Sequence, residues 1–180
     1  RTTTGQDVAQ VNRNTLEVCI GTMSMALSCI MAGTGDLPTF RILRHLRSRL
    51  EASSTSNSGL TYGAHMAINM ANGFLFLGGG TQTFSTSNAS IAALLIAMFP
   101  RFPSDTSDNR WHCQAFRHLY VLAAKKRLLN TTDADTGEPV STPIELVVRD
   151  LGGEQTTQVV TPCLLPEPAS LCRVRVISPR

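Results

Sequence analysis

The chain has 180 residues, of which 42% are hydrophobic and 16% carry a charge, so it is long enough to bury one sizeable core. Its net charge of +3 is too small to indicate a nucleic-acid-binding protein. The five cysteines form no CxxC pair, and their odd number argues against a disulfide-stabilised secreted protein and favours a reducing intracellular setting.

Residues 1–13 are polar and are predicted to be a frayed lead-in. They carry no signal-peptide pattern, and we expect the chain to be a piece of a larger protein. The next segment, 16–32, is predicted to be an apolar helix. It ends at Gly33 and Gly35, because glycine adopts the left-handed conformation that follows a helix C-terminus. The uncharged run 18–35 leaves open the alternative of a membrane helix bundle.

An amphipathic helix is predicted from Pro38 to Leu50, since proline is favourable at the first helical position. The side predicted to face inward carries Ile42, Leu43, Leu46 and Leu50. The opposite side is basic, with Arg41, Arg44, Arg47 and Arg49. An apolar helix packed on an amphipathic one forms the two layers of a helical stack. We therefore assign 14–50 to a first helical repeat and the serine-rich 51–59 to a mobile linker.

The segment 62–99 is the most apolar part of the chain, with no Asp, Glu, Lys or Arg and one histidine, His65. We predict that the whole segment is buried. A first helix ends at Gly78–Gly80, where the glycines permit the turn, and a second helix follows at 89–99. We assign 60–103 to a second helical repeat.

The two predicted glycine turns share one offset: 45 residues separate Gly33 from Gly78, and Gly35 from Gly80. An offset that superposes turn glycines and apolar helix faces together indicates an internal repeat. A period between about 20 and 50 residues is typical of a solenoid. One further shift reaches a helix predicted at 109–124, where the glycines are missing. We assign 104–130 to a third, eroded helical repeat.

Beyond residue 130 the pattern becomes alternating and turn-rich. Strands are predicted at 144–148, 156–161 and 171–177. We assign 131–180 to a β-rich appendage. The predicted fold is therefore mainly α: an α-α helical-repeat solenoid followed by a small β-rich C-terminal appendage.

Three patterns could indicate chemistry, but each has a simpler structural explanation. Gly78–Thr81 lacks the lysine of a phosphate-binding loop and follows a helix instead of preceding one. His112 and Cys113, or His65 with a distant cysteine, do not show the paired spacing of zinc ligands. Cys113 with His112 or His118 could form a nucleophile and base, but no acidic orienting group is placed beside them. We predict packed core residues, with no catalytic residue, no metal and no cofactor.

The arginines of the 38–50 helix give one candidate interaction surface. A solvated helix face is the default explanation for such a row of charges. The alternative is that Arg41, Arg44 and Arg47 face a partner, with an acidic protein surface favoured over nucleic acid.

Two copies of a glycine- and alanine-rich helix pair resemble proteasome/cyclosome repeats. Such repeats occur in the two large non-ATPase subunits of the proteasome base and in the largest subunit of the anaphase-promoting complex/cyclosome. The segments YGAHMAINMANGFLFLGGG, TSNASIAALLIAMFPRFP and SDNRWHCQAFRHLYVLAA are especially similar to the cyclosome subunit. The resemblance is close over about 59–139, holds only at the level of the repeat over 14–50, and is weak after Val140.

The resemblance implies a closed or strongly curved solenoid and a non-catalytic scaffold role in a multi-subunit ubiquitin ligase of the cell cycle. In that family the repeat glycines allow tight stacking, a role that carries over to Gly33, Gly35, Gly78 and Gly80. The implied partners are other ligase subunits and coactivator or regulatory proteins, without nucleic acid or membrane, in the nucleus and cytoplasm.

Two alternatives stay open. One is a scaffold subunit of the proteasome regulatory-particle base, which would present receptors for ubiquitin or shuttle proteins. The other is the membrane helix bundle, against which the polar residues of the most apolar helix weigh: His65, Asn69 and Asn72.

Overall fold

A computed structural model of the chain describes residues 13–54, 62–98, 102–103, 107–108 and 112–177. The predicted lead-in at 1–12 and the part of the predicted linker at 55–59 lie outside the described residues.

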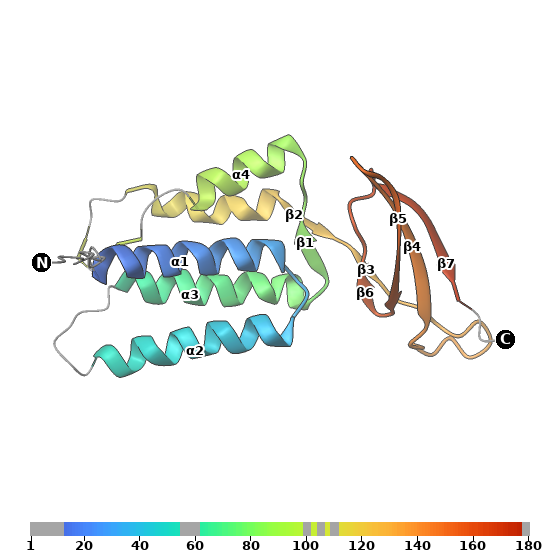
Figure 1. Cartoon of the computed structure of the whole chain (residues 1–180), viewed down its shortest axis with the longest axis horizontal. Coiled ribbons are helices and arrows are strands. Elements are labelled where there is room, and N and C mark those ends of the chain that lie inside the picture. The colour runs from blue at the N-terminus through green and yellow to red at the C-terminus, as the bar shows by residue number, and fades with distance from the viewer. Residues whose placement is uncertain (1–12, 55–61, 99–101, 104–106, 109–111, 178–180) are drawn as a thin grey trace, which may run out of the picture.

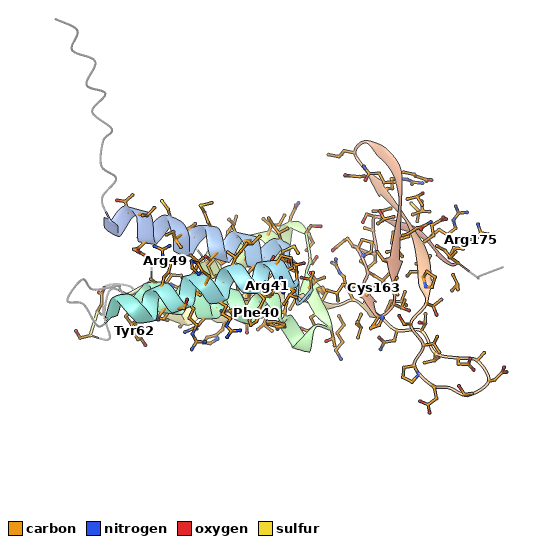
Figure 2. The ribbon with its side chains drawn as sticks, turned by 60° about the horizontal axis from the view of Figure 1, so that its bottom comes forward. Phe40, Arg41, Arg49, Tyr62, Cys163 and Arg175 are labelled. Atoms are coloured by element: carbon orange, nitrogen blue, oxygen red, sulfur yellow. The ribbon has the colours of Figure 1, made fainter. Side chains whose placement is uncertain are left out.

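Four α-helices and one long 3-10 helix form the part of the described molecule that we name the helical unit (Figure 1). They are α1 (Arg13–Ile30), α2 (Leu37–Ser54), α3 (Tyr62–Leu75), α4 (Asn88–Met98) and η2 (His112–Leu122). α3 packs against both α1 and α2, and α4 packs against η2. In the turned view of Figure 2, α2 comes to the front of this unit.

Side-chain caps begin two of these helices. The backbone N–H and the hydroxyl of Thr39 both donate to Asp36 Oδ2, at 2.9 and 2.7 Å, and so cap the first turn of α2. Ser87 Oγ accepts from the Ser90 N–H at 3.3 Å and caps α4 in the same way. These bonds satisfy N–H groups that have no partner inside the helix, and they explain where α2 and α4 start.

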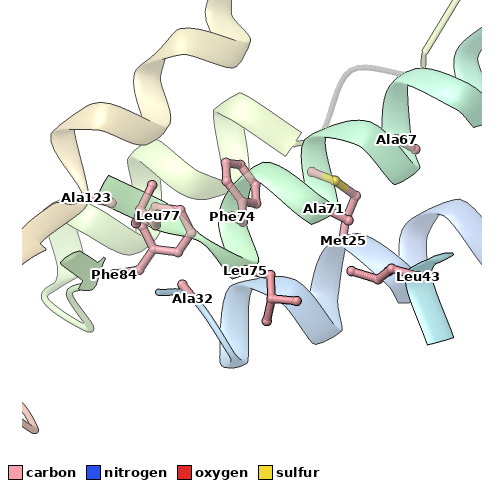
Figure 3. Close-up of a cluster of buried hydrophobic side chains, with 10 residues drawn as sticks. All are labelled: Met25, Ala32, Leu43, Ala67, Ala71, Phe74, Leu75, Leu77, Phe84 and Ala123. Carbon is pink, nitrogen blue, oxygen red and sulfur yellow. The ribbon is translucent and has the colours of Figure 1, made fainter. Parts of the chain in front are cut away.

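The core of the helical unit lies along α3. Figure 3 shows the ten buried side chains of its main cluster, which include Phe74 and Leu75 from α3 and Leu43 from α2. The Phe74 ring meets the rings of Phe84 and Tyr120 edge-on, with centroids 5.0 and 5.1 Å apart. Such edge-to-face contacts are favourable beyond the burial of their area. The core therefore joins segments that are far apart in the chain.

Small residues let α1 and α3 approach closely. A Cβ placed on Gly21 of α1 would lie 3.3 Å from the Cβ of Ala67 on α3. At Gly63 a Cβ would lie 2.5 Å from the Cβ of Phe102. Larger residues at these positions would push the neighbouring segments apart.

Three small antiparallel sheets accompany the helices in the described residues. Inside the helical unit, β1 (Gln82–Phe84) pairs with β2 (Ala124–Lys126), and Thr83 lies opposite Lys125. The remaining strands form what we name the sheet unit, at the right of Figure 1. It contains the pair β3 (Leu128–Leu129) and β6 (Cys163–Leu164), and a sheet in the order β5 (Gly153–Val160), β4 (Pro143–Asp150) and β7 (Leu171–Val176).

The predicted fold class, a mainly α helical-repeat solenoid with a small β-rich appendage, is wrong. The described chain is mixed α/β, with three small sheets. Three of the strands, β1, β2 and β3, lie within the part predicted to be helical repeats. They have two or three residues each, too few to show the alternation by which a strand is recognised. The predicted α-helix at 109–124 is also corrected, because η2 is a 3-10 helix over 112–122.

A buried polar contact joins the two units. Ser85 Oγ, in the helical unit, donates to Glu167 Oε1 at 2.7 Å, and Arg127 forms an ion pair with Glu167 Oε2. The side chains of Arg127 and Glu167 are 7% and 24% exposed. Burial lowers the pKa of the Arg127 guanidinium from its ordinary value, yet arginine keeps its charge at neutral pH. We name this contact, made by Ser85, Arg127 and Glu167, the junction.

Candidate functional site

The four predicted turn glycines lie where α1 and α3 end. The Gly33 N–H donates to the Phe74 carbonyl and the Gly35 N–H donates to the Leu75 carbonyl, both at 3.0 Å. The carbonyls of the last helical turn have no partner within their helix, so the turn after α1 caps the end of α3. We name this feature the glycine corner; it comprises Gly33, Gly35, Gly78 and Gly80.

All four corner glycines have positive φ, which side chains other than glycine rarely adopt. Space is also short: a Cβ on Gly33 would lie 1.7 Å from the Gln82 carbonyl oxygen. A Cβ on Gly80 would lie 3.5 Å from the Gly33 carbonyl oxygen, so the two predicted turns are neighbours in space. That these glycines act as repeat turns stays a prediction.

The predicted basic side lies on the exposed surface of α2. Arg41, Arg44 and Arg47 are all exposed, as is Arg49, whereas Leu43 is fully buried against the core. Figure 2 labels Arg41 and Arg49 on this helix. We name Arg41, Arg44, Arg47 and Arg49 the basic face of α2. One inward prediction is wrong, because Ile42 is 52% exposed.

A groove of about 480 Å³ opens between α1 and α3. Its lining is mainly apolar and includes Val18, Met25, Ile30, Ala64, Met98 and Phe102. Cys29 lies in this lining, with its Sγ 3.2 Å from Met98 Sδ. Burial raises the pKa of the Cys29 thiol to about 11, so it stays protonated at neutral pH. The groove is therefore suited to receive apolar groups and not to supply a nucleophile.

Large apolar side chains also stand exposed on three helices, and we name them the apolar outer faces. On α1 they are Leu16, Val18, Met23 and Ile30; on α4 they are Ile91, Leu95 and Ile96; on η2 they are Phe116, Val121 and Leu122. Ile30 is 79% exposed, and Leu95 is 64% exposed. The prediction that all of 62–99 is buried is thus wrong for α4. Contiguous exposed apolar surface is typical of an interaction site.

The described residues test part of the chemical patterns considered above. The Thr81 hydroxyl donates to the Gly78 carbonyl at 2.7 Å, so the glycine run closes on itself as a turn. Among the residues that the structure describes, no group of three His, Cys, Asp or Glu side chains is placed to hold a metal ion. The side chains of His112 and Cys113 lie outside the described part. Within that same part, the helices are too short or too polar to cross a membrane.

Comparison with known proteins gives the family. A family model described as the APC1 fifth domain matches residues 2–125. Anaphase-promoting complex subunit 1 of Arabidopsis thaliana is 52% identical over 172 residues, which are 94% of this chain. This chain belongs to the anaphase-promoting complex subunit 1 family. The subunit 1 proteins of Dictyostelium discoideum and Homo sapiens are 50% and 42% identical, over 95% and 92% of this chain. A relative from Emericella nidulans, 43% identical, is named negative regulator of mitosis.

Membership of this family places the chain among proteins named as subunits of the anaphase-promoting complex, and one relative is named for a role in mitosis. The matches support the cyclosome side of the resemblance over the proteasome side. The chain spans 10% of the Arabidopsis relative and 7% of the Dictyostelium relative.

Sequence reasoning missed the groove, the junction and the apolar outer faces. Each of them depends on which helix faces stay uncovered or on contacts between distant segments, such as the 82 residues between Ser85 and Glu167. The one available signal was the lack of charge in 62–99, which indicates apolar surface without indicating which neighbour covers it.

Proposed function

We propose that this chain is a non-catalytic scaffold segment of a cell-cycle ubiquitin ligase, the anaphase-promoting complex, and that it holds other parts of that assembly in place. The observation that carries the proposal is the set of apolar outer faces on α1, α4 and η2. In the full-length subunit these faces pack against further protein. The proposal extends to coactivator and regulatory proteins as partners and to a nuclear and cytoplasmic location, in keeping with the family membership.

The energetics of the exposed side chains support an assembly role. Covering a large aliphatic side chain contributes about 1.5–3 kcal/mol relative to leaving it in water. Met23 and Ile30 of α1 are 71% and 79% exposed, so a partner that covers them would add most of that contribution to its binding free energy. The groove beside them offers a concave surface for the apolar side chains of a partner.

The protonation of the groove thiol supports the non-catalytic part of the proposal. A thiol with a pKa of about 11 has very little thiolate at neutral pH, so Cys29 is a packing residue. Arg117, from η2, lies over the Phe102 ring, 3.6 Å from its centroid, and thus also serves packing.

The test replaces Met23 and Ile30 with lysine in the full-length subunit and measures how much of each other subunit co-purifies with it. We expect the loss of at least one subunit. Losing two apolar contacts of about 1.5–3 kcal/mol each would weaken the binding of that subunit more than a hundredfold. Both positions are exposed, so the melting temperature of the isolated 180-residue chain should change little.

The matched control is Val160→Lys on β5, a side chain that is 58% exposed but lies in the sheet unit. It should leave the subunit composition as in the unmodified protein. If the α1 double variant assembles as completely as this control, the outer face of α1 holds no partner and the proposal fails.

A further inference from the structure

Three arginines of the basic face of α2 lie in a row along the helix. Arg41, Arg44 and Arg47 are three residues apart, whereas Arg49 lies about 160° around the helix from Arg47. With a rise of 1.5 Å per residue, the row from Arg41 to Arg47 is about 9 Å long. The buried Leu43 holds the opposite side against the core, so the arginine side chains are presented outward by a fixed helix.

Arg41, Arg44 and Arg49 form no ion pair among the residues that the structure describes. The acidic residue that precedes them most closely in the sequence is Asp36, and its carboxylate accepts two hydrogen bonds from Thr39 as the cap of α2. Like charges at helical i, i+3 spacing repel each other. The surface therefore favours a ligand that brings negative charge.

An apolar side chain stands beside Arg41 and Arg44. Leu37 is 53% exposed and lies on the same side of the helix as these two arginines, whereas Ile42, 52% exposed, lies on the side of Arg49. Phe40 packs edge-on against Phe76, which is itself 45% exposed, with ring centroids 5.6 Å apart. Arginine and aromatic side chains around apolar contacts are enriched in protein–protein interfaces.

We propose that the basic face of α2 binds an acidic segment of another protein in the ligase assembly. The segment carries at least two carboxylates, which pair with Arg41 and Arg44, and an apolar side chain that contacts Leu37. About three residues of extended chain, or two turns of a helix, cover the 9 Å row. The inference rests on the proposed scaffold function and names the chemistry of one partner.

A protein fits this surface better than nucleic acid does. A nucleic-acid footprint is a broad basic patch with phosphate contacts, and the whole chain has a net charge of only +3. The exposed Leu37 would lie against phosphates without a matching contact, whereas an amphipathic acidic segment satisfies both the charges and the apolar group.

The experiment places a photo-reactive amino acid at position 37 of the full-length subunit in the purified, assembled complex. The cross-linked peptide is identified by mass spectrometry. We expect one segment of another protein, with a clear excess of Asp and Glu over Lys and Arg. Arg41→Glu with Arg44→Glu should lower the cross-link yield about tenfold, equal to about 1.4 kcal/mol. Lysine substitutions of the acidic residues in the partner segment should restore it.

The matched control is Arg173→Glu with Arg175→Glu on β7, two exposed arginines of the sheet unit. This control should leave the yield unchanged. A neutral or basic cross-linked segment, a nucleic-acid cross-link, no cross-link at all, or an equal yield in the α2 variant would each overturn the inference.

The outcome is separable from the test of the scaffold function. If the Met23 and Ile30 variant loses subunits while position 37 gives no acidic cross-link, only the α2 inference fails. If that variant assembles normally, the scaffold proposal fails whatever position 37 contacts.

Discussion

Replacing Glu167 with glutamine removes the charge that joins the sheet unit to the helical unit. Arg127, whose side chain is 7% exposed, would then keep its buried charge without a counter-ion. Removing one partner of a buried ion pair costs about 3–5 kcal/mol. Glu167 is 24% exposed, and glutamine can still accept from Ser85, so we expect a loss of about 2–3 kcal/mol in the free energy of unfolding.

Urea denaturation of the 180-residue chain measures this loss from the shift of the midpoint at constant slope. The matched control is Glu154→Gln, which breaks the Arg149–Glu154 pair, whose side chains are 69% and 55% exposed. For an exposed pair we expect a change below about 1 kcal/mol. If both variants lose the same small amount, the junction does not stabilise the fold and the reasoning from burial is refuted.

Three further predictions concern the helical unit. Gly33→Ala should destabilise the chain by more than about 4 kcal/mol, because its Cβ would overlap the Gln82 carbonyl oxygen. Gly79→Ala is the control: it has open space at a positive φ and should cost about 1–2 kcal/mol. Equal losses of unfolding free energy in urea denaturation would contradict the corner geometry. Cys29 should react with iodoacetamide at pH 8 about a hundredfold more slowly than an exposed cysteine, because a pKa of about 11 leaves little thiolate. Mass spectrometry measures the labelling, and an equal rate for both cysteines would show that the Cys29 thiol is not buried. The hydrogen bonds from Thr39 lower the pKa of Asp36 below its ordinary 3.8, so its contribution to stability is present above pH 3.8 and is lost as pH falls through the lowered value. Asp36→Ala should therefore lower the melting temperature at pH 7, and a difference that persists unchanged in strong acid would refute the role of the charge.

The helices were the most predictable part of the fold. The helices α1 and α4 lie within a few residues of the predicted 16–32 and 89–99. These signals are local: Ser87 caps α4 through a hydrogen bond to a residue three positions away. The end of α2 was less clear, because the serine-rich sequence continues the helix to Ser54 instead of breaking it at Leu50.

The longer strands could also be predicted, but the sheets as a set could not. β4 covers the predicted 144–148, and β7 covers most of the predicted 171–177, where apolar and charged residues alternate in the sequence. β1 and β2 pair across about 40 residues, and nothing in three residues of either strand identifies its partner. The fold class was therefore mistaken although most of the helices and long strands were found.

For the candidate site, helical periodicity was sufficient to predict that Arg41 and Arg44 are exposed, because the solvent-facing side is a local property of one helix. Periodicity could not predict that Ile42 is also exposed to solvent, because its burial depends on how α2 packs on α3. The same limit applies to the junction. Arg127 and Glu167 are 40 residues apart, and only the folded chain brings them together.

The hydrogen bonds of the glycine corner run from one helix end to another, and this links the opening of the two helices. The last carbonyls of α3 receive their donors from the turn that follows α1, through Gly33 and Gly35. If either end frays, the other loses its partners at the same moment, so both ends belong to one cooperative foldon. Native-state hydrogen exchange should accordingly report a single opening free energy for the amides of Gly33 and Gly35.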